Sequence, residues 1–126
     1  MNIPENLLYS SDHEWVRIES ERAVIGITDY AQDALGDVVF VDLPDVGGVV
    51  TAGASITEVE STKSVSDIYA PIAGTIIDVN QDLSESPELL NEDPYGEGWI
   101  CAIEFADGSQ FPDLLTAEQY GALIES

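Results

Sequence analysis

A single lysine stands in this chain of 126 residues, which otherwise carries only two basic side chains. Lys63 lies within the stretch 59–68, VESTKSVSDI, between β-branched and small hydroxyl residues. A short strand is expected to end near Ser61 and another to begin near Val65, so Lys63 falls at the tip of a tight hairpin turn. A primary amine at such a tip is exposed and can display a covalently attached arm.

The charge around Lys63 favours a carrier over a catalyst. A catalytic lysine must be neutral to attack, whereas a lone ammonium among 25 acidic residues is held in its charged form. Lys63 is therefore expected to react only when a ligase presents an activated acyl group. Once acylated, a long flexible arm on a rigid hairpin would keep its reactive end at high effective concentration near each docked active site.

The composition argues against some classes of binding partner and some kinds of chemistry. The formal net charge of -22 would repel nucleic acids and anionic membranes, and it indicates basic docking partners, adaptation to salty surroundings, or both. One cysteine, Cys101, permits no disulfide within the chain and no cysteine-based metal site, so redox sulfur chemistry requires an added group. No apolar run approaches the roughly 20 residues of a membrane span, and the first residues lack the basic start of a signal or transit peptide. We expect a cytoplasmic monomer.

Many short strands with regular Gly and Pro punctuation predict one mainly β domain over residues 1–126, built as a small β-sandwich or flattened barrel. Residues 15–18 and 23–27 are expected to form a hairpin through a short polar turn. Further strands are expected at 38–41, 54–59, 65–69, 74–79 and 99–105. The segments 46–50 and 72–76 resemble each other loosely, which indicates a half-repeat folded about the lysine turn.

Two helices are expected to accompany these strands. A short helix in the N-terminal half covers 28–35, with Asp29 and Gln32 as an N-terminal capping pair and Gly36 as the stop. A C-terminal helix covers about 116–125. There Thr116 and Gln119 form a second capping box, and an apolar stripe is expected to pack on the sheet.

The stretch 80–98 is rich in turn signals. We expect most of it to be ordered loop, with a turn of helix at 88–90.

The segments around the lysine resemble the lipoate-attachment region of glycine cleavage system H proteins. The likeness lies in Glu60-Ser61-Thr62-Lys63 and in residues 66–74, SDIYAPIAG. It extends over nearly the whole chain, in order, through 13–16, 26–28, 31–32, 35–37, 41–44, 86–91, 94–96 and 98–99. Lipoyl domains of the 2-oxoacid dehydrogenases usually place Asp before the lysine, and biotin carriers flank theirs with Met. Thr62 and Ser64 disfavour both relatives.

The resemblance implies a non-catalytic carrier with the barrel-sandwich fold of lipoyl and biotinyl carriers. Lipoic acid would be joined by an amide to Lys63, by a lipoate ligase or lipoyltransferase. The arm would accept an aminomethyl group from glycine on a pyridoxal-phosphate-dependent glycine decarboxylase (P protein). A tetrahydrofolate-dependent aminomethyltransferase (T protein) would take the one-carbon unit, and a flavin-dependent dihydrolipoamide dehydrogenase (L protein) would reoxidise the arm.

The resemblance also implies a cleft that shelters the loaded arm, because water at the aminomethyl group would release ammonia and formaldehyde. Glu14 and Asp67 occupy positions that the family uses near the bound amine, where a carboxylate would pair with the ammonium. Asp12 occupies a neighbouring position with a less defined role. The alternative for Glu14 and Asp67 is a pair of solvated carboxylates. Glu60 is interpreted as a recognition residue for the ligase, with an ordinary outward strand residue as its alternative.

Two other functional classes stay open as alternatives. An enzyme could use Glu14 and Asp67 as an acid–base pair, but the chain offers no nucleophile motif, no Gly-rich phosphate loop and no metal cluster. An interaction module, or a lipoyl donor that passes its group to other proteins, would use the same Lys63. His13 is interpreted as structural and Cys101 as a buried, inert thiol.

Overall fold

The structure, a computed structural model, describes residues 2–105 and 114–125. In this part of the chain the fold consists of short strands and four helices. The strands are β1 Leu8–Tyr9, β2 Glu14–Glu19, β3 Arg22–Ile27, β4 Val38–Asp42, β5 Val49–Val50, β6 Ser55–Ser61, β7 Val65–Tyr69, β8 Gly74–Val79 and β9 Cys101–Glu104. The helices are α1 Asp29–Leu35, α2 Asp82–Glu85, α3 Leu89–Glu92 and α4 Ala117–Glu125. The predicted strands and both predicted helices are therefore present, with shifts of one or two residues at most of their ends.

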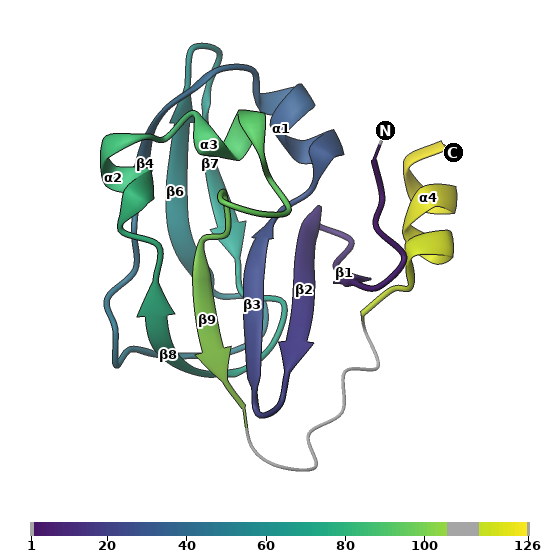
Figure 1. The fold of residues 1–126 in the computed structure, drawn as a ribbon, viewed down its shortest axis with the longest axis vertical. Helices are drawn as coiled ribbons and strands as arrows, with labels where there is room; N and C mark the ends of the chain where they lie inside the picture. The colour runs from purple at the N-terminus through teal and green to yellow at the C-terminus, as the bar shows by residue number, and fades with distance from the viewer. Residues whose placement is uncertain (1, 106–113, 126) are drawn as a thin grey trace.

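Two antiparallel sheets make up the molecule. One has six strands in the order β1-β2-β3-β9-β8-β5, and the other has three in the order β4-β6-β7. Figure 1 shows α1, α2 and α3 gathered at the end where the β6–β7 hairpin turns, while α4 lies beside the N-terminal segment. The mainly β sandwich predicted from the sequence is confirmed, and it places the lysine hairpin at one end of the molecule.

The apolar faces of both sheets meet in one buried cluster. The six-stranded sheet contributes Val16 and Ile25, and the three-stranded sheet contributes Val59 and Ile68. Fully burying side chains of this size stabilises a fold by roughly 1.5–3 kcal/mol each. Cys101 lies in the same cluster, where burial raises the pKa of its thiol to about 12. The thiol is thus buried and protonated, as predicted.

The start of α1 differs in detail from the prediction. Thr28, not Asp29, is the N-cap, because its Oγ1 accepts a hydrogen bond from the backbone N–H of Ala31. Asp29 does pair with Gln32, accepting from its side-chain amide at 2.7 Å, but both residues lie inside the first turn. Gly36 ends the helix with φ +82°, as expected for a glycine stop.

Three elements were missing from the prediction. β1 and β5 have two residues each, which is too short for an alternating pattern to be read. The stretch 80–98 contains α2 as well as α3, each of four residues, where we expected loop with one helical turn.

The half-repeat has a structural counterpart. β5 comes from the first segment and β8 from the second, and the two strands pair with each other through Val49 opposite Thr75 and Val50 opposite Gly74. The two similar segments on either side of Lys63 therefore lie side by side in the six-stranded sheet.

The capping box predicted for the C-terminal helix α4 is confirmed. The Thr116 N–H donates to Gln119 Oε1, and the Gln119 N–H donates to Thr116 Oγ1, which is the reciprocal pattern of a capping box. Tyr120 projects from this helix and stacks on Tyr9 of β1, with ring centroids 4.8 Å apart. Among the described residues, no helix has the length and apolar character needed to cross a membrane.

Candidate arm pocket beside the lysine hairpin

The hairpin between β6 and β7 is ordered by its own serine. The backbone N–H groups of Lys63 and Ser64 both donate to Ser61 Oγ, at 3.2 and 3.1 Å. The Ser61 N–H donates to the carbonyl of Ser64, and the Thr62 N–H donates to the carbonyl of Asp37 after α1. Lys63 is exposed at the tip of this turn. The predicted position of the lysine is confirmed, and the turn is fixed at both ends.

The stem of Lys63 lies against Gly36. A Cβ atom built on Gly36 would stand 3.1 Å from Lys63 Cε and 3.3 Å from Cδ, which is tighter than nearly all real contacts of this kind. Glycine at this position therefore does two things: it permits the positive φ that ends α1, and it leaves room for the lysine stem. The stem is laid along the end of α1 rather than projecting freely from the tip.

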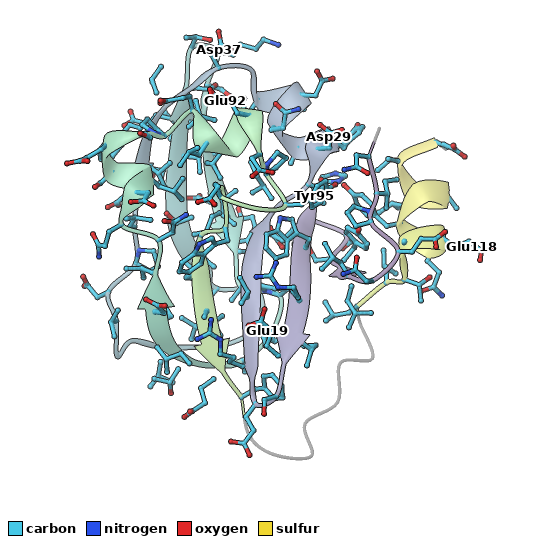
Figure 2. All side chains as sticks on the ribbon, in the orientation of Figure 1. Glu19, Asp29, Asp37, Glu92, Tyr95 and Glu118 are labelled. Carbon is cyan, nitrogen blue, oxygen red and sulfur yellow. The ribbon has the colours of Figure 1, made fainter. Side chains whose placement is uncertain are left out.

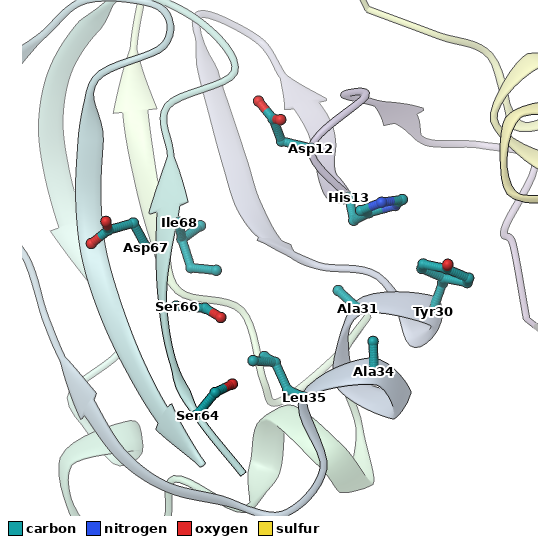
Figure 3. A pocket seen from close by; sticks show the side chains of 10 residues that line it. All are labelled: Asp12, His13, Tyr30, Ala31, Ala34, Leu35, Ser64, Ser66, Asp67 and Ile68. Carbon is teal, nitrogen blue, oxygen red and sulfur yellow. The ribbon is translucent and has the colours of Figure 1, made fainter.

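An open pocket of about 250 Å³ begins beside this stem, between α1 and β7. Figure 3 shows Ser64 and Leu35 at the end nearer the hairpin and Asp12 and His13 at the other end. The α1 wall is mainly apolar, whereas β7 offers hydroxyl groups along the opposite side. The full lining is Asp12, His13, Tyr30, Ala31, Ala34, Leu35, Ser64, Ser66, Asp67 and Ile68. At roughly 3.3 Å per residue along the strand, the pocket is about 13 Å long from Ser64 to Ile68, and we also call it the trough.

Glu14 is the one predicted site residue that is fully enclosed, with 1% of its surface exposed. Ser10 Oγ donates to Glu14 Oε1 at 2.6 Å, and the Tyr69 N–H donates to Oε2 at 3.3 Å. Burial raises the pKa of this carboxyl from 4.5 to about 7, against the opposing effect of these two hydrogen bonds. The interpretation of Glu14 as a solvated surface carboxylate is therefore wrong.

Glu14 lines a second pocket of about 250 Å³. Asp12 is the residue that both pockets share, and it is exposed. The two pockets thus meet at the turn of residues 10–14.

Asp67 occupies a different environment. It is exposed, and Figure 3 shows its carboxylate on the side of β7 opposite to Ile68. On that face it lies directly across from Glu58, which in turn lies across from Asp42. Ser55 Oγ approaches it at 3.4 Å. The structure thus brings Asp67 to the rim of the first pocket together with Asp12, and it places Glu14 in the other pocket.

Glu60 lies on the outer face of the three-stranded sheet. Its cross-strand neighbours are Phe40 on β4 and Val65 on β7, which are 50% and 56% exposed. An acidic side chain therefore stands between two exposed apolar ones, three residues before the lysine. Figure 2 shows further carboxylates at the hairpin end of the molecule, including Asp37 and Glu92.

Known proteins are similar to this chain both in sequence and in structure. A family model described as glycine cleavage H-protein matches residues 7–126 of the chain. The chain belongs to the glycine cleavage H-protein family. It is 53% identical to the glycine cleavage system H protein of Geobacillus thermodenitrificans over 98% of both chains. It is 52% identical to that of Thermus thermophilus, over all of this chain and 98% of the relative. A crystal structure of the H protein of Mycobacterium marinum matches with a TM-score of 0.90 and 42% identity, covering 98% of this chain and 100% of that one.

Membership in the H-protein family makes this chain a lipoyl-carrier component of the glycine cleavage system and not an enzyme. The geometry agrees with a carrier that is not an enzyme. An enzyme would have used Glu14 and Asp67 as an acid–base pair, but these two residues line different pockets. The alternatives of a lipoyl relay and an unmodified interaction module are not favoured by these matches.

Several residues of the H-protein pocket were not singled out from the sequence. Ala31, Ala34 and Leu35 share one helical face by their spacing of three and four residues, so a helical projection could have found that wall. The contact of Ser10 with Glu14 and that of Gly36 with Lys63 gave no such signal. The partner of Ser10 is defined by a tight turn, and the neighbour of Gly36 is a lysine stem 27 positions further along the chain.

Proposed function

We propose that Lys63 carries lipoic acid through an amide bond and that this arm conveys the aminomethyl group of glycine between the enzymes of the system. The observation that carries the proposal is the position of the Lys63 stem, which lies against Gly36, while the chain neighbours Leu35 and Ser64 line the pocket between α1 and β7. When bound, lipoic acid supplies a sulfur pair that takes up the one-carbon group and cycles between disulfide and dithiol.

The residues around Lys63 fit such an arm. The pocket has an apolar wall for a hydrocarbon chain, formed by Ala31, Ala34 and Leu35, and this wall ends next to Gly36, against which the lysine stem lies. An apolar chain in this trough would be removed from water, which favours rest on the protein over free movement in solvent. Exposure of the hairpin tip leaves the arm able to leave the trough again.

We further propose that Asp12 and Glu14 hold the amine end of the cargo. An ammonium next to the buried Glu14 would favour its ionised form and lower its pKa from about 7, so loading would release a proton from this carboxyl. The resulting ion pair lies where water is scarce, which strengthens it. By excluding water there, the pocket would slow the loss of ammonia. Asp67, at the rim, would attract the cation rather than enclose it.

Docking of partners is assigned to the outer face of the three-stranded sheet. Phe40 and Val65 would provide an apolar contact, and the acidic side chains around them would select surfaces rich in Lys and Arg. The proposed partners are glycine decarboxylase, aminomethyltransferase, dihydrolipoamide dehydrogenase and the lipoate ligase or lipoyltransferase. For the last of these Glu60 would mark the lysine hairpin. The cytoplasm stays our predicted location.

The test is K63R, which keeps the charge and length of the side chain but cannot be acylated. This variant should fold as the wild type and lose glycine-dependent bicarbonate exchange with the purified partner enzymes. A matched control is the double variant K63R/R22K, which again has one lysine, now at the β2–β3 hairpin. It should stay unmodified and inactive. Full exchange by either variant would overturn the assignment of the arm to Lys63.

A further inference from the structure

The C-terminal helix α4 reaches the arm pocket through one hydroxyl group. Tyr120 is fully buried, and its OH lies 2.8 Å from His13 Nδ1 and 2.7 Å from Thr28 Oγ1. These two partners are 107 and 92 residues away in the sequence. The three groups form a short hydrogen-bonded chain that connects α4 with the 10–14 turn and with the start of α1.

The donors and acceptors in this chain have one consistent direction. Burial lowers the pKa of His13, which favours the neutral imidazole. Thr28 Oγ1 accepts from the Ala31 N–H at the start of α1, so the Thr28 hydroxyl hydrogen is free to donate to Tyr120. Tyr120 can then donate to Nδ1 of His13, and the imidazole carries its proton on Nε2. Each hydroxyl donates once and accepts once.

His13 shapes the turn that presents both carboxylates of the pocket. Its φ of +70° is uncommon for a residue with a side chain, and it lies between Asp12 and Glu14. Its N–H donates to the carbonyl of Ser10, and its own carbonyl accepts from the Thr28 N–H at 3.1 Å. The turn of residues 10–14 is therefore tied to the cap of α1 by the backbone on one side and by Tyr120 on the other.

The two partners of Tyr120 belong to two different walls of the pocket. His13 and the adjacent Asp12 line its end away from the hairpin, while Thr28 begins the helix whose residues Ala31 and Leu35 form its apolar wall. Removal of the bridging oxygen would leave His13 Nδ1 without its hydrogen-bond donor and would free the turn to move relative to α1. An unmade hydrogen bond at a buried site is costly, so such movement would be favoured.

We propose that Tyr120 is a positioning residue for the carrier function: its hydroxyl holds the 10–14 turn against α1 and so keeps the end of the arm pocket in the position that shelters the cargo. This inference rests on the function proposed above. It assigns to α4, a helix that lines neither pocket, control over how long the loaded arm is protected.

The matched variants are Y120F and Y9F, because the two rings stack on each other and each variant removes one hydroxyl while keeping the stack. The Tyr9 hydroxyl donates to the carbonyl of Pro4, away from the pocket. Each protein is lipoylated, loaded with the aminomethyl group, separated from the enzymes and followed for release of ammonia. Y120F should lose ammonia about fivefold faster than the wild type, the factor that corresponds to the ~1 kcal/mol of one hydrogen bond. Y9F should match the wild type.

A second readout does not depend on lipoylation. His13 is the only histidine in the chain, so its ring nitrogens give unambiguous signals in a long-range ¹H–¹⁵N correlation spectrum. The Nδ1 signal of the unmodified protein should shift in Y120F and stay in place in Y9F. This pattern shows that the hydrogen bond between Tyr120 and His13 is lost in Y120F alone. A merely structural role for Tyr120 would give this shift and a lower melting temperature without faster loss of ammonia.

The possible outcomes distinguish a failure of this inference from a failure of the proposed function. If the wild type loses ammonia as fast as loaded free lipoamide, no protective pocket exists, and both the inference and the proposed role of Asp12 and Glu14 are overturned, while the assignment of the arm to Lys63 stands. If the wild type protects its cargo and Y120F protects it equally well, Tyr120 is not a positioning residue and only the inference is overturned. Faster loss in Y120F alone, together with the shifted His13 signal, supports it. The double variant H13N/Y120F adds a check, because an effect transmitted through His13 leaves the double variant no faster than its faster parent.

Discussion

Replacing Glu14 by glutamine should make the free energy of unfolding less dependent on pH. Glu14 is buried, and its pKa in the folded protein rises from 4.5 to about 7. At about 1.4 kcal/mol for each tenfold change in the proton equilibrium, this difference amounts to about 3 kcal/mol. Such a contribution is a large share of the stability of a small domain.

The sign follows from which state holds the proton. Below about pH 4.5 the carboxyl is protonated in both the folded and the unfolded chain, and the full contribution is present. Between about pH 4.5 and pH 7 the unfolded chain loses this proton while the folded chain keeps it, so the free energy of unfolding falls. Above pH 7 both states are ionised and the deficit is constant. E14Q has no proton to lose at this site.

Urea unfolding of the wild type and E14Q at several values from about pH 4 to pH 8.5 measures this difference directly. The free energy of unfolding of E14Q, relative to the wild type, should rise by about 3 kcal/mol over this range, with most of the change between pH 4.5 and 7. E58Q is the matched control, because Glu58 is exposed on the outer sheet face and its loss removes one of the same 25 acidic charges. A wild type and E14Q that respond to pH in parallel would refute the account of Glu14 as a buried carboxyl.

Two further predictions concern the frame of the site and its outer face. N91A should lower the free energy of unfolding, measured in urea, by about 1–3 kcal/mol. The reason is that the Asn91 side chain accepts from the Val38 N–H and donates to the carbonyl of Gly36 beside the lysine stem. An unchanged free energy of unfolding would show that these hydrogen bonds do not hold the hairpin end together. F40S should leave stability nearly unchanged but raise the KM of the partner enzymes for this carrier several-fold, whereas V49S, at an exposed apolar residue of the other sheet, should not. Equal kinetics for F40S and V49S would remove the three-stranded sheet from the docking surface.

The features that the sequence predicted well depend on neighbours along the chain. The hairpin at Lys63, the β2–β3 hairpin and the capping box of Thr116 and Gln119 each lie within a few consecutive residues, so local spacing is sufficient to find them. The cap of α1 was misplaced by one residue because Thr28 and Asp29 are both good capping residues. Only the folded chain shows that the threonine oxygen meets the helix.

The features that escaped prediction depend on contacts between distant residues. In the sequence, Glu14 looks like one acidic residue among many. It is buried because the three-stranded sheet brings the backbone of Tyr69, 55 residues away in the chain, against it. The contact of Tyr120 with His13 spans 107 residues, and neither residue type alone indicates it. Glu14 and Asp67 were grouped by family resemblance. The structure separates them because the 10–14 turn stands between their pockets.

The central claim is that Lys63 carries the arm, and one measurement tests it most directly. The protein is taken from its native host, its intact mass is recorded, and the peptides that contain Lys63 are mapped. We expect the added mass of a single lipoyl group, located on Lys63, which is the only lysine in the chain. An unmodified lysine, or one that carries biotin, would contradict it.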